Sequence, residues 1–64
     1  MTQEFRMHCG LADGYAGILR VMSTAQQPNL ERMNKHMRDL ENSVSRMRVL
    51  LDEATDNYIE SMKR

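Results

Sequence analysis

Apolar side chains in the second half of the chain recur with alternating steps of three and four residues. This spacing is the a/d pattern of a helix that packs along one seam, and it is kept for four heptads. No glycine or proline interrupts it, so the pattern predicts one long helix over about residues 29–63. The seam positions that we expect to pack against another helix are Leu30, Met33, Met37, Leu40, Val44 and Met47.

A shorter apolar stripe precedes this helix and predicts another one over about residues 3–26. Thr2 is a suitable N-cap, and Glu4 lies in the first turn, where the helix dipole favours an acidic side chain. The apolar positions of this first helix are Phe5, Leu11, Ala12, Tyr15, Ile18, Leu19 and Met22.

Three glycines weaken the first helix, at positions 10, 14 and 17. Each costs about 0.5–1 kcal/mol relative to alanine inside a helix, and the pair Asp13-Gly14 is also a turn signal. Two interpretations follow. Either the helix is continuous and the glycines form a smooth strip that a second backbone approaches, or it breaks near residues 10–14.

The clearest break in the helical pattern is the segment of residues 23–29. Gln27 precedes Pro28 and is therefore disfavoured in the α conformation, whereas Pro28 itself is tolerated in the first turn of a helix. Alternatively, Asn29 caps the second helix. Short links join antiparallel neighbours, so the prediction is an all-α fold, a helical hairpin forming a single domain over residues 1–64.

The two predicted helices differ in length. At 1.5 Å per residue the first spans about 36 Å and the second about 50 Å, so about the last ten residues of the second helix should extend beyond the first. Apolar side chains continue into that extension, and exposed apolar patches commonly mark interaction sites. The predicted partner-binding residues are Leu51, Ala54, Tyr58, Ile59 and Met62.

Chain length and composition indicate assembly with another chain. A core made by only 64 residues is marginal, and a single cysteine cannot form an intrachain disulfide. Association, with a second copy or with a different protein, is the usual remedy. The Met-rich seam favours an adaptable surface, and Val49, Leu50 and Ile59 widen the apolar stripe beyond a simple zipper. We therefore expect a bundle of three or more helices.

The charge and hydropathy of the chain limit the surroundings in which we expect the protein to work. Nine basic and nine acidic residues give a net charge of zero, which disfavours binding to nucleic acid or to a membrane surface. The sequence contains no run of 18 apolar residues and no recognisable signal peptide. With one free cysteine, these features lead us to expect a cytoplasmic protein.

The residues with potential chemistry do not form a convincing catalytic or ligand site. His8 and Cys9 are adjacent and lie about 100° apart on a helix, and His36 belongs to the other helix, so a metal site is disfavoured. Four acids cluster near the extension with nothing to enclose them, which is typical of a solvated face. We expect no enzymatic activity, no metal, no cofactor and no small-molecule substrate. The acids are Asp52, Glu53, Asp56 and Glu60.

Two further functions remain open from the residues. Basic side chains in the middle of the second helix would allow a dimeric hairpin to hold RNA. The plasmid copy-number regulator Rop works in this way, and the chain is similar to Rop in size and topology. The chain could also be a coiled-coil segment of a larger assembly. The basic residues are Arg32, Lys35, Arg38, Arg46 and Arg48.

In layout, the chain resembles the small co-chaperones of type III secretion needle proteins over its whole length. Members of that family are helical hairpins of similar length that join a second chaperone to shield the needle subunit. The resemblance implies a hairpin fold and a role in protein–protein interaction, as a chaperone, adaptor or assembly subunit.

Overall fold

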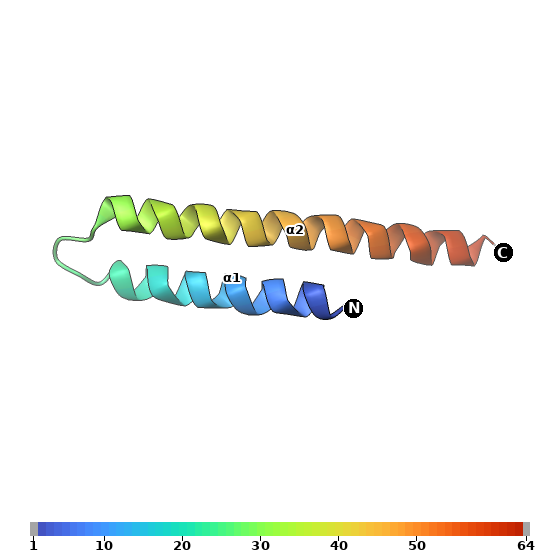
Figure 1. Ribbon diagram of the computed structural model, residues 1–64, viewed down its shortest axis with the longest axis horizontal. Helices are drawn as coiled ribbons and strands as arrows, with labels where there is room; N and C mark the ends of the chain where they lie inside the picture. The colour runs from blue at the N-terminus through green and yellow to red at the C-terminus, as the bar shows by residue number, and fades with distance from the viewer. Residues whose placement is uncertain (1, 64) are drawn as a thin grey trace.

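The computed structural model describes residues 2–63 and contains two helices, α1 (Gln3–Met22) and α2 (Leu30–Met62). The helices lie side by side and antiparallel, in a rod of 58 × 15 × 14 Å (Figure 1). The predicted all-α hairpin is therefore confirmed. The predicted domain of residues 1–64 also includes residues 1 and 64, which lie outside the described residues. No helix within residues 2–63 is long and apolar enough to cross a membrane.

Both helices begin at a side-chain cap. The hydroxyl of Thr2 accepts a hydrogen bond from the backbone N–H of Phe5 at 3.3 Å. The side-chain oxygen of Asn29 accepts one from the backbone N–H of Arg32 at 3.1 Å. Each cap satisfies one of the N–H groups that a helix start leaves without a partner. The predicted cap at Thr2 is confirmed, and Asn29 is the cap of α2.

Helix α1 ends at Met22, before the predicted end at about residue 26. The Ser23 hydroxyl donates to the carbonyl of Arg20 at 2.6 Å, and the Thr24 hydroxyl donates to the carbonyl of Val21 at 2.7 Å. These side chains satisfy carbonyls of the last turn, so the helix can end there without leaving them unpaired.

The glycines do not break α1. The helix is continuous from Gln3 to Met22, and none of its glycines has a positive φ. A Cβ atom built at Gly10, Gly14 or Gly17 would meet nothing within 4 Å. The structure therefore supports the continuous interpretation, but the backbone of α2 does not approach the glycines.

The two helices meet along one narrow line of half-buried side chains. Ser43, 5% exposed, is the one buried residue among residues 2–63, and no hydrophobic side chain in this range is buried. The line follows three-four spacing on both helices. From α1 it contains Phe5, His8, Ala12, Tyr15, Leu19 and Met22. From α2 it contains Met33, His36, Leu40, Ser43, Met47 and Leu50.

The structure divides the predicted seam of α2 into two halves. Met33, Leu40 and Met47 are half-buried on the side of α2 that carries the inter-helix line, whereas the other predicted members are exposed. The second position of the inter-helix line is instead taken by His36, Ser43 and Leu50. The small Ser43 is the most buried of these residues. One helix cannot cover the full width of the apolar stripe on α2, and α1 covers only one edge of it. The predicted seam residues left exposed are Leu30, Met37 and Val44.

Candidate protein-docking surface

A row of exposed apolar side chains runs along α2, with one member in every seventh position. We call it the α2 stripe. Their exposed fractions are 67, 45, 50, 38 and 64% in chain order. A seven-residue repeat returns to nearly the same side of a helix, so these side chains lie on one flank of α2. The members of the α2 stripe are Leu30, Met37, Val44, Leu51 and Tyr58.

The α2 stripe is continuous with an apolar groove between the two helices. Phe5 of α1 lines this groove together with Val44, Met47 and Leu51 of α2, and the side chain of Arg48 closes one edge. The groove is shallow, with a volume of about 180 Å³. Because Phe5 lies on the same face as Val44 and Leu51, a partner that covers the stripe would also contact the start of α1.

The opposite flank of α2 is charged. The guanidinium of Arg46 donates to the carboxylate of Glu4 at 2.7 Å, which joins α2 to the first turn of α1. This hydrogen bond from Arg46 holds the pKa of the Glu4 carboxyl below its ordinary value of 4.5, and Glu4 in turn raises the pKa of Arg46. Lys35 and Asp39 form a second ion pair nearby, at 3.4 Å. These groups are satisfied without a partner chain.

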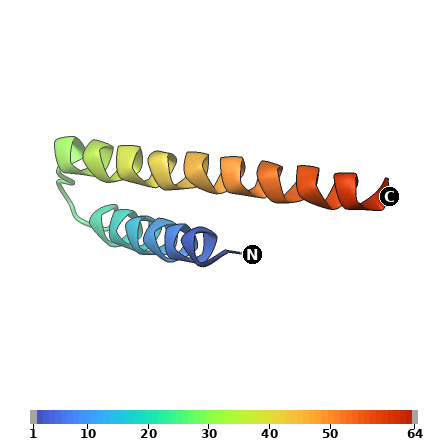
Figure 2. The same ribbon diagram turned by 45° about the vertical axis from the view of Figure 1, so that its right-hand side comes forward.

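The end of α2 extends past α1 (Figures 1 and 2). The ion pair between Glu4 and Arg46 shows that α1 begins level with Arg46, so the part of α2 beyond about residue 50 has no helix beside it. We call this part the overhang.

The overhang carries all five predicted partner-binding residues. Leu51 and Tyr58 belong to the α2 stripe, and Ile59 and Met62 are also exposed, whereas Ala54 is half-buried. Spacings of three and four residues make Tyr58, Ile59 and Met62 neighbours on the helix surface. The structure therefore gathers three exposed apolar side chains, Tyr58, Ile59 and Met62, at the end of α2, beyond the start of α1.

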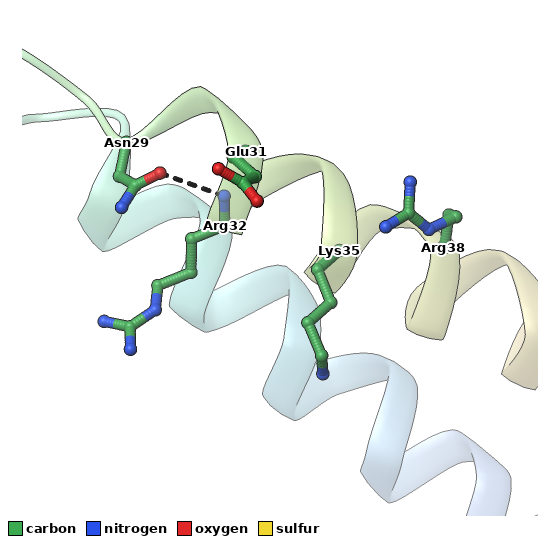
Figure 3. Close-up of a pocket in the computed structure, with 5 residues that line it drawn as sticks. All are labelled: Asn29, Glu31, Arg32, Lys35 and Arg38. Carbon is green, nitrogen blue, oxygen red and sulfur yellow. Dashed lines mark hydrogen bonds between the residues drawn. The ribbon is translucent and has the colours of Figure 1, made fainter.

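A basic depression lies at the turn end of α2. Its rim contains Arg32, Lys35 and Arg38, together with the cap residue Asn29 and Glu31 (Figure 3). The depression has a volume of about 480 Å³ and is open to solvent. In Figure 3 the side chains of Arg32 and Lys35 extend in one direction and that of Arg38 in another, so the three basic groups do not converge on one point.

Two histidines lie in the inter-helix line. The rings of Tyr15 and His36 are 6.4 Å apart at a tilt of 31°, and His8 lies 3.9 Å from the Glu4 carboxylate. The Nδ1 atoms of both histidines are buried and have no hydrogen-bond partner among the described residues. From the sequence these histidines were expected to be surface or flank residues and not ligands, although the seven-residue spacing of His8 from Tyr15 and of His36 from Ser43 could have placed them between the helices.

Within residues 2–63 no three His, Cys, Asp or Glu side chains gather closely enough to hold a metal ion. Comparison of the chain with protein-family models, with curated proteins and with solved structures finds no significant match. The arrangement of exposed apolar and charged side chains is therefore what indicates its function.

Proposed function

We propose that this chain is a small protein–protein interaction module without enzymatic activity, and that it docks through the α2 stripe and the overhang. One observation carries the proposal. No hydrophobic side chain among residues 2–63 is buried, while a continuous row of large apolar side chains is exposed on one flank of α2. Burial of apolar surface is the main force for both folding and association, so covering this row would supply the burial that the hairpin lacks.

The more specific proposal is a cytoplasmic chaperone, adaptor or assembly subunit. A helical hairpin with an exposed apolar overhang has the layout of the co-chaperones of type III secretion needle proteins. In that role the apolar end of α2 would bind a helix of the partner, because an amphipathic helix presents its apolar side chains at matching three-four spacing.

Substitutions in the overhang test the proposal. Tyr58→Ala and Met62→Glu remove apolar surface where α1 does not reach, so they should abolish partner binding and leave helicity largely unchanged. Binding is measured by sedimentation of the chain alone and by co-purification with each protein encoded beside its gene. Helicity is measured by circular dichroism.

A matched control is Asp56→Ala, which changes an exposed side chain of the same turns without removing apolar surface. It should retain binding. Loss of helical signal together with binding would show that Tyr58 and Met62 support the fold, and unchanged binding by both overhang variants would contradict the proposal.

A second candidate function is RNA binding by a dimeric hairpin. The observation in its favour is the group of Arg32, Lys35 and Arg38 at the turn end of α2 (Figure 3). Phosphate contacts by these side chains would give an affinity that falls steeply with salt. Titration of a labelled RNA stem-loop at low salt tests this function, with Arg32→Ala and Arg38→Ala as variants. No binding at low salt excludes it.

A further inference from the structure

We infer that the partner covering the α2 stripe is a second copy of this chain, with its α2 antiparallel to the first and with Val44 at the two-fold axis. This inference rests on the proposed function, since it identifies the occupant of the same docking surface. Four properties of the described residues support a second copy: exposed area, register, side-chain segregation and helix length.

The exposed area of the chain fits a dimer. A monomeric globular protein of 7.5 kDa is expected to expose about 4,250 Å² of surface. This chain exposes 5379 Å², which exceeds that expectation by about 1,100 Å². Stable protein interfaces bury about 800 Å² on each partner. Two copies meeting through their stripes therefore have enough excess surface for a stable interface.

The register follows from the seven-residue repeat of the stripe. Val44 is its middle member, with two members before it and two after it. An antiparallel pair centred on Val44 places Met37 of each copy beside Leu51 of the other, and Leu30 beside Tyr58 of the other. Every member of the stripe then faces another apolar side chain, and the interface is identical on both copies, as two-fold symmetry requires.

The side chains that flank the α2 stripe are charged along one edge and apolar along the other, which suits an antiparallel pair. Beside Met37 and Val44, one edge of the stripe carries the charged residues four positions later, Glu41 and Arg48. The other edge carries the apolar residues three positions later, Leu40 and Met47. In an antiparallel pair the charged edge of one α2 meets the charged edge of the other, so Glu41 of one copy lies near Arg48 of the other. The apolar edge likewise meets the apolar edge.

A parallel pair lacks this match. It would set the charged edge of one helix against the apolar edge of the other, and Glu41 would lie against Leu40 or Met47. Within one chain Arg48 already bonds Asp52 at 2.9 Å. A guanidinium has five N–H donors, so Arg48 can bind Asp52 and a second carboxylate together.

The difference in length between α1 and α2 also fits an antiparallel pair centred on Val44. Helix α2 has 33 residues and α1 has 20. With Val44 at the axis, the overhang of one copy lies level with the part of the other copy's α2 that α1 accompanies. Each overhang therefore lies against the partner's hairpin. The middle of the dimer, where both α1 helices lie beside the α2 pair, contains four helices, and the levels of the overhangs contain three. Such a bundle would cover the stripe, the overhang and the exposed side of Met33, Leu40 and Met47.

Engineered disulfides test both the association and its direction. In a full-length chain carrying Cys9→Ala, the variant Val44→Cys should form a covalent dimer on mild oxidation, because Val44 of the two copies would be in contact. The variant Met37→Cys alone should not, since the two positions would be separated by 14 residues of helix, or about 21 Å. That separation far exceeds the roughly 7 Å limit between the Cα atoms of a disulfide.

A mixture of the Met37→Cys and Leu51→Cys chains should form the covalent heterodimer. Covalent dimers from Met37→Cys alone would show a parallel pair and overturn the inference. Absence of a dimer from both Val44→Cys and the mixture would also overturn it.

Sedimentation equilibrium provides a measurement that needs no cysteine. Val44→Glu would place two like charges at the axis, so the dimer dissociation constant should rise by at least about 100-fold, while Ser45→Glu, exposed on another side of α2, should leave it nearly unchanged. A wild-type chain that is helical and monomeric at sub-millimolar concentration would overturn the inference. If such a monomer still binds a co-expressed protein through Tyr58, the proposed function stands and only the second copy is excluded.

Discussion

The two flanks of α2 differ in whether their side chains find partners within this chain. On the charged flank, Arg46 reaches Glu4 on α1 at 2.7 Å, and Lys35 reaches Asp39 at 3.4 Å. On the other flank, the members of the α2 stripe are 38–67% exposed, and Phe5 of α1 lines a groove beside two of them. Charged side chains are stable in water, whereas exposed apolar side chains gain free energy only when something covers them. The comparison teaches that the charged flank is satisfied within one chain, whereas the apolar flank leaves surface that a partner would cover.

The largest effect is expected between the two flanks, on the line that contacts α1. Leu40 is half-buried there, and replacing a packed leucine by alanine lowers the free energy of unfolding by about 2 kcal/mol or more. Because no hydrophobic side chain among residues 2–63 is fully buried, Leu40→Ala should unfold most of the protein. Circular dichroism during urea titration measures this loss.

The matched control for Leu40→Ala is Val21→Ala, which truncates an apolar side chain that is 66% exposed on α1. Its effect should stay within about 0.5 kcal/mol. Equal destabilisation by both variants would show that the inter-helix line contributes no more than the exposed surface, and the contrast between covered and uncovered apolar positions would be lost.

An intermediate effect, of opposite sign, is expected away from both flanks. An alanine Cβ at Gly10 or Gly14 meets nothing within 4 Å, so Gly10→Ala and Gly14→Ala should each stabilise α1 by about 0.5–1 kcal/mol. Thermal unfolding measures the gain. The dimer dissociation constant should not rise, because these positions lie outside the proposed interface. A weaker dimer would instead place a second backbone against the glycines.

The smallest effect is expected on the charged flank. Because Arg46 lowers the pKa of Glu4, the ion pair stabilises the folded state above the ordinary pKa of 4.5, and this contribution is lost as the pH falls through the lowered folded-state pKa. Glu4→Gln should therefore reduce the loss of stability on acidification below pH 4.5. Urea unfolding at several pH values measures the difference.

Asp13→Asn is the control for Glu4→Gln, since Asp13 forms no ion pair with another described residue. It should leave the acid dependence of the wild type nearly intact. If both variants flatten the pH profile equally, the contact between Glu4 and Arg46 has no special role in holding the start of α1.

Most of the fold could be predicted from the sequence. The hairpin follows from two amphipathic patterns separated by Pro28, and the cap at Thr2 follows from its position before the first apolar residue. The end of α1 was predicted too late. Apolar spacing does not reveal that the hydroxyls of Ser23 and Thr24 bond the last carbonyls of the helix.

The rotation of α2 about its own axis could not be predicted. A heptad pattern identifies an apolar stripe, but side-chain size decides which edge of the stripe meets a neighbouring helix. In this chain the small Ser43 takes a central inter-helix position, and the larger Val44 remains exposed. Hydropathy ranks Val44 above Ser43 for burial, so it favours the opposite choice.

The unequal length of the two helices also bears on how large an assembly this chain can form. Helices with an uncovered apolar end can add further copies in sequence and grow into filaments. In the proposed dimer each overhang is occupied by the hairpin of the other copy, so no end is left to recruit a third. The thirteen residues by which α2 exceeds α1 would then act as a stop on polymerisation, giving particles of one defined size.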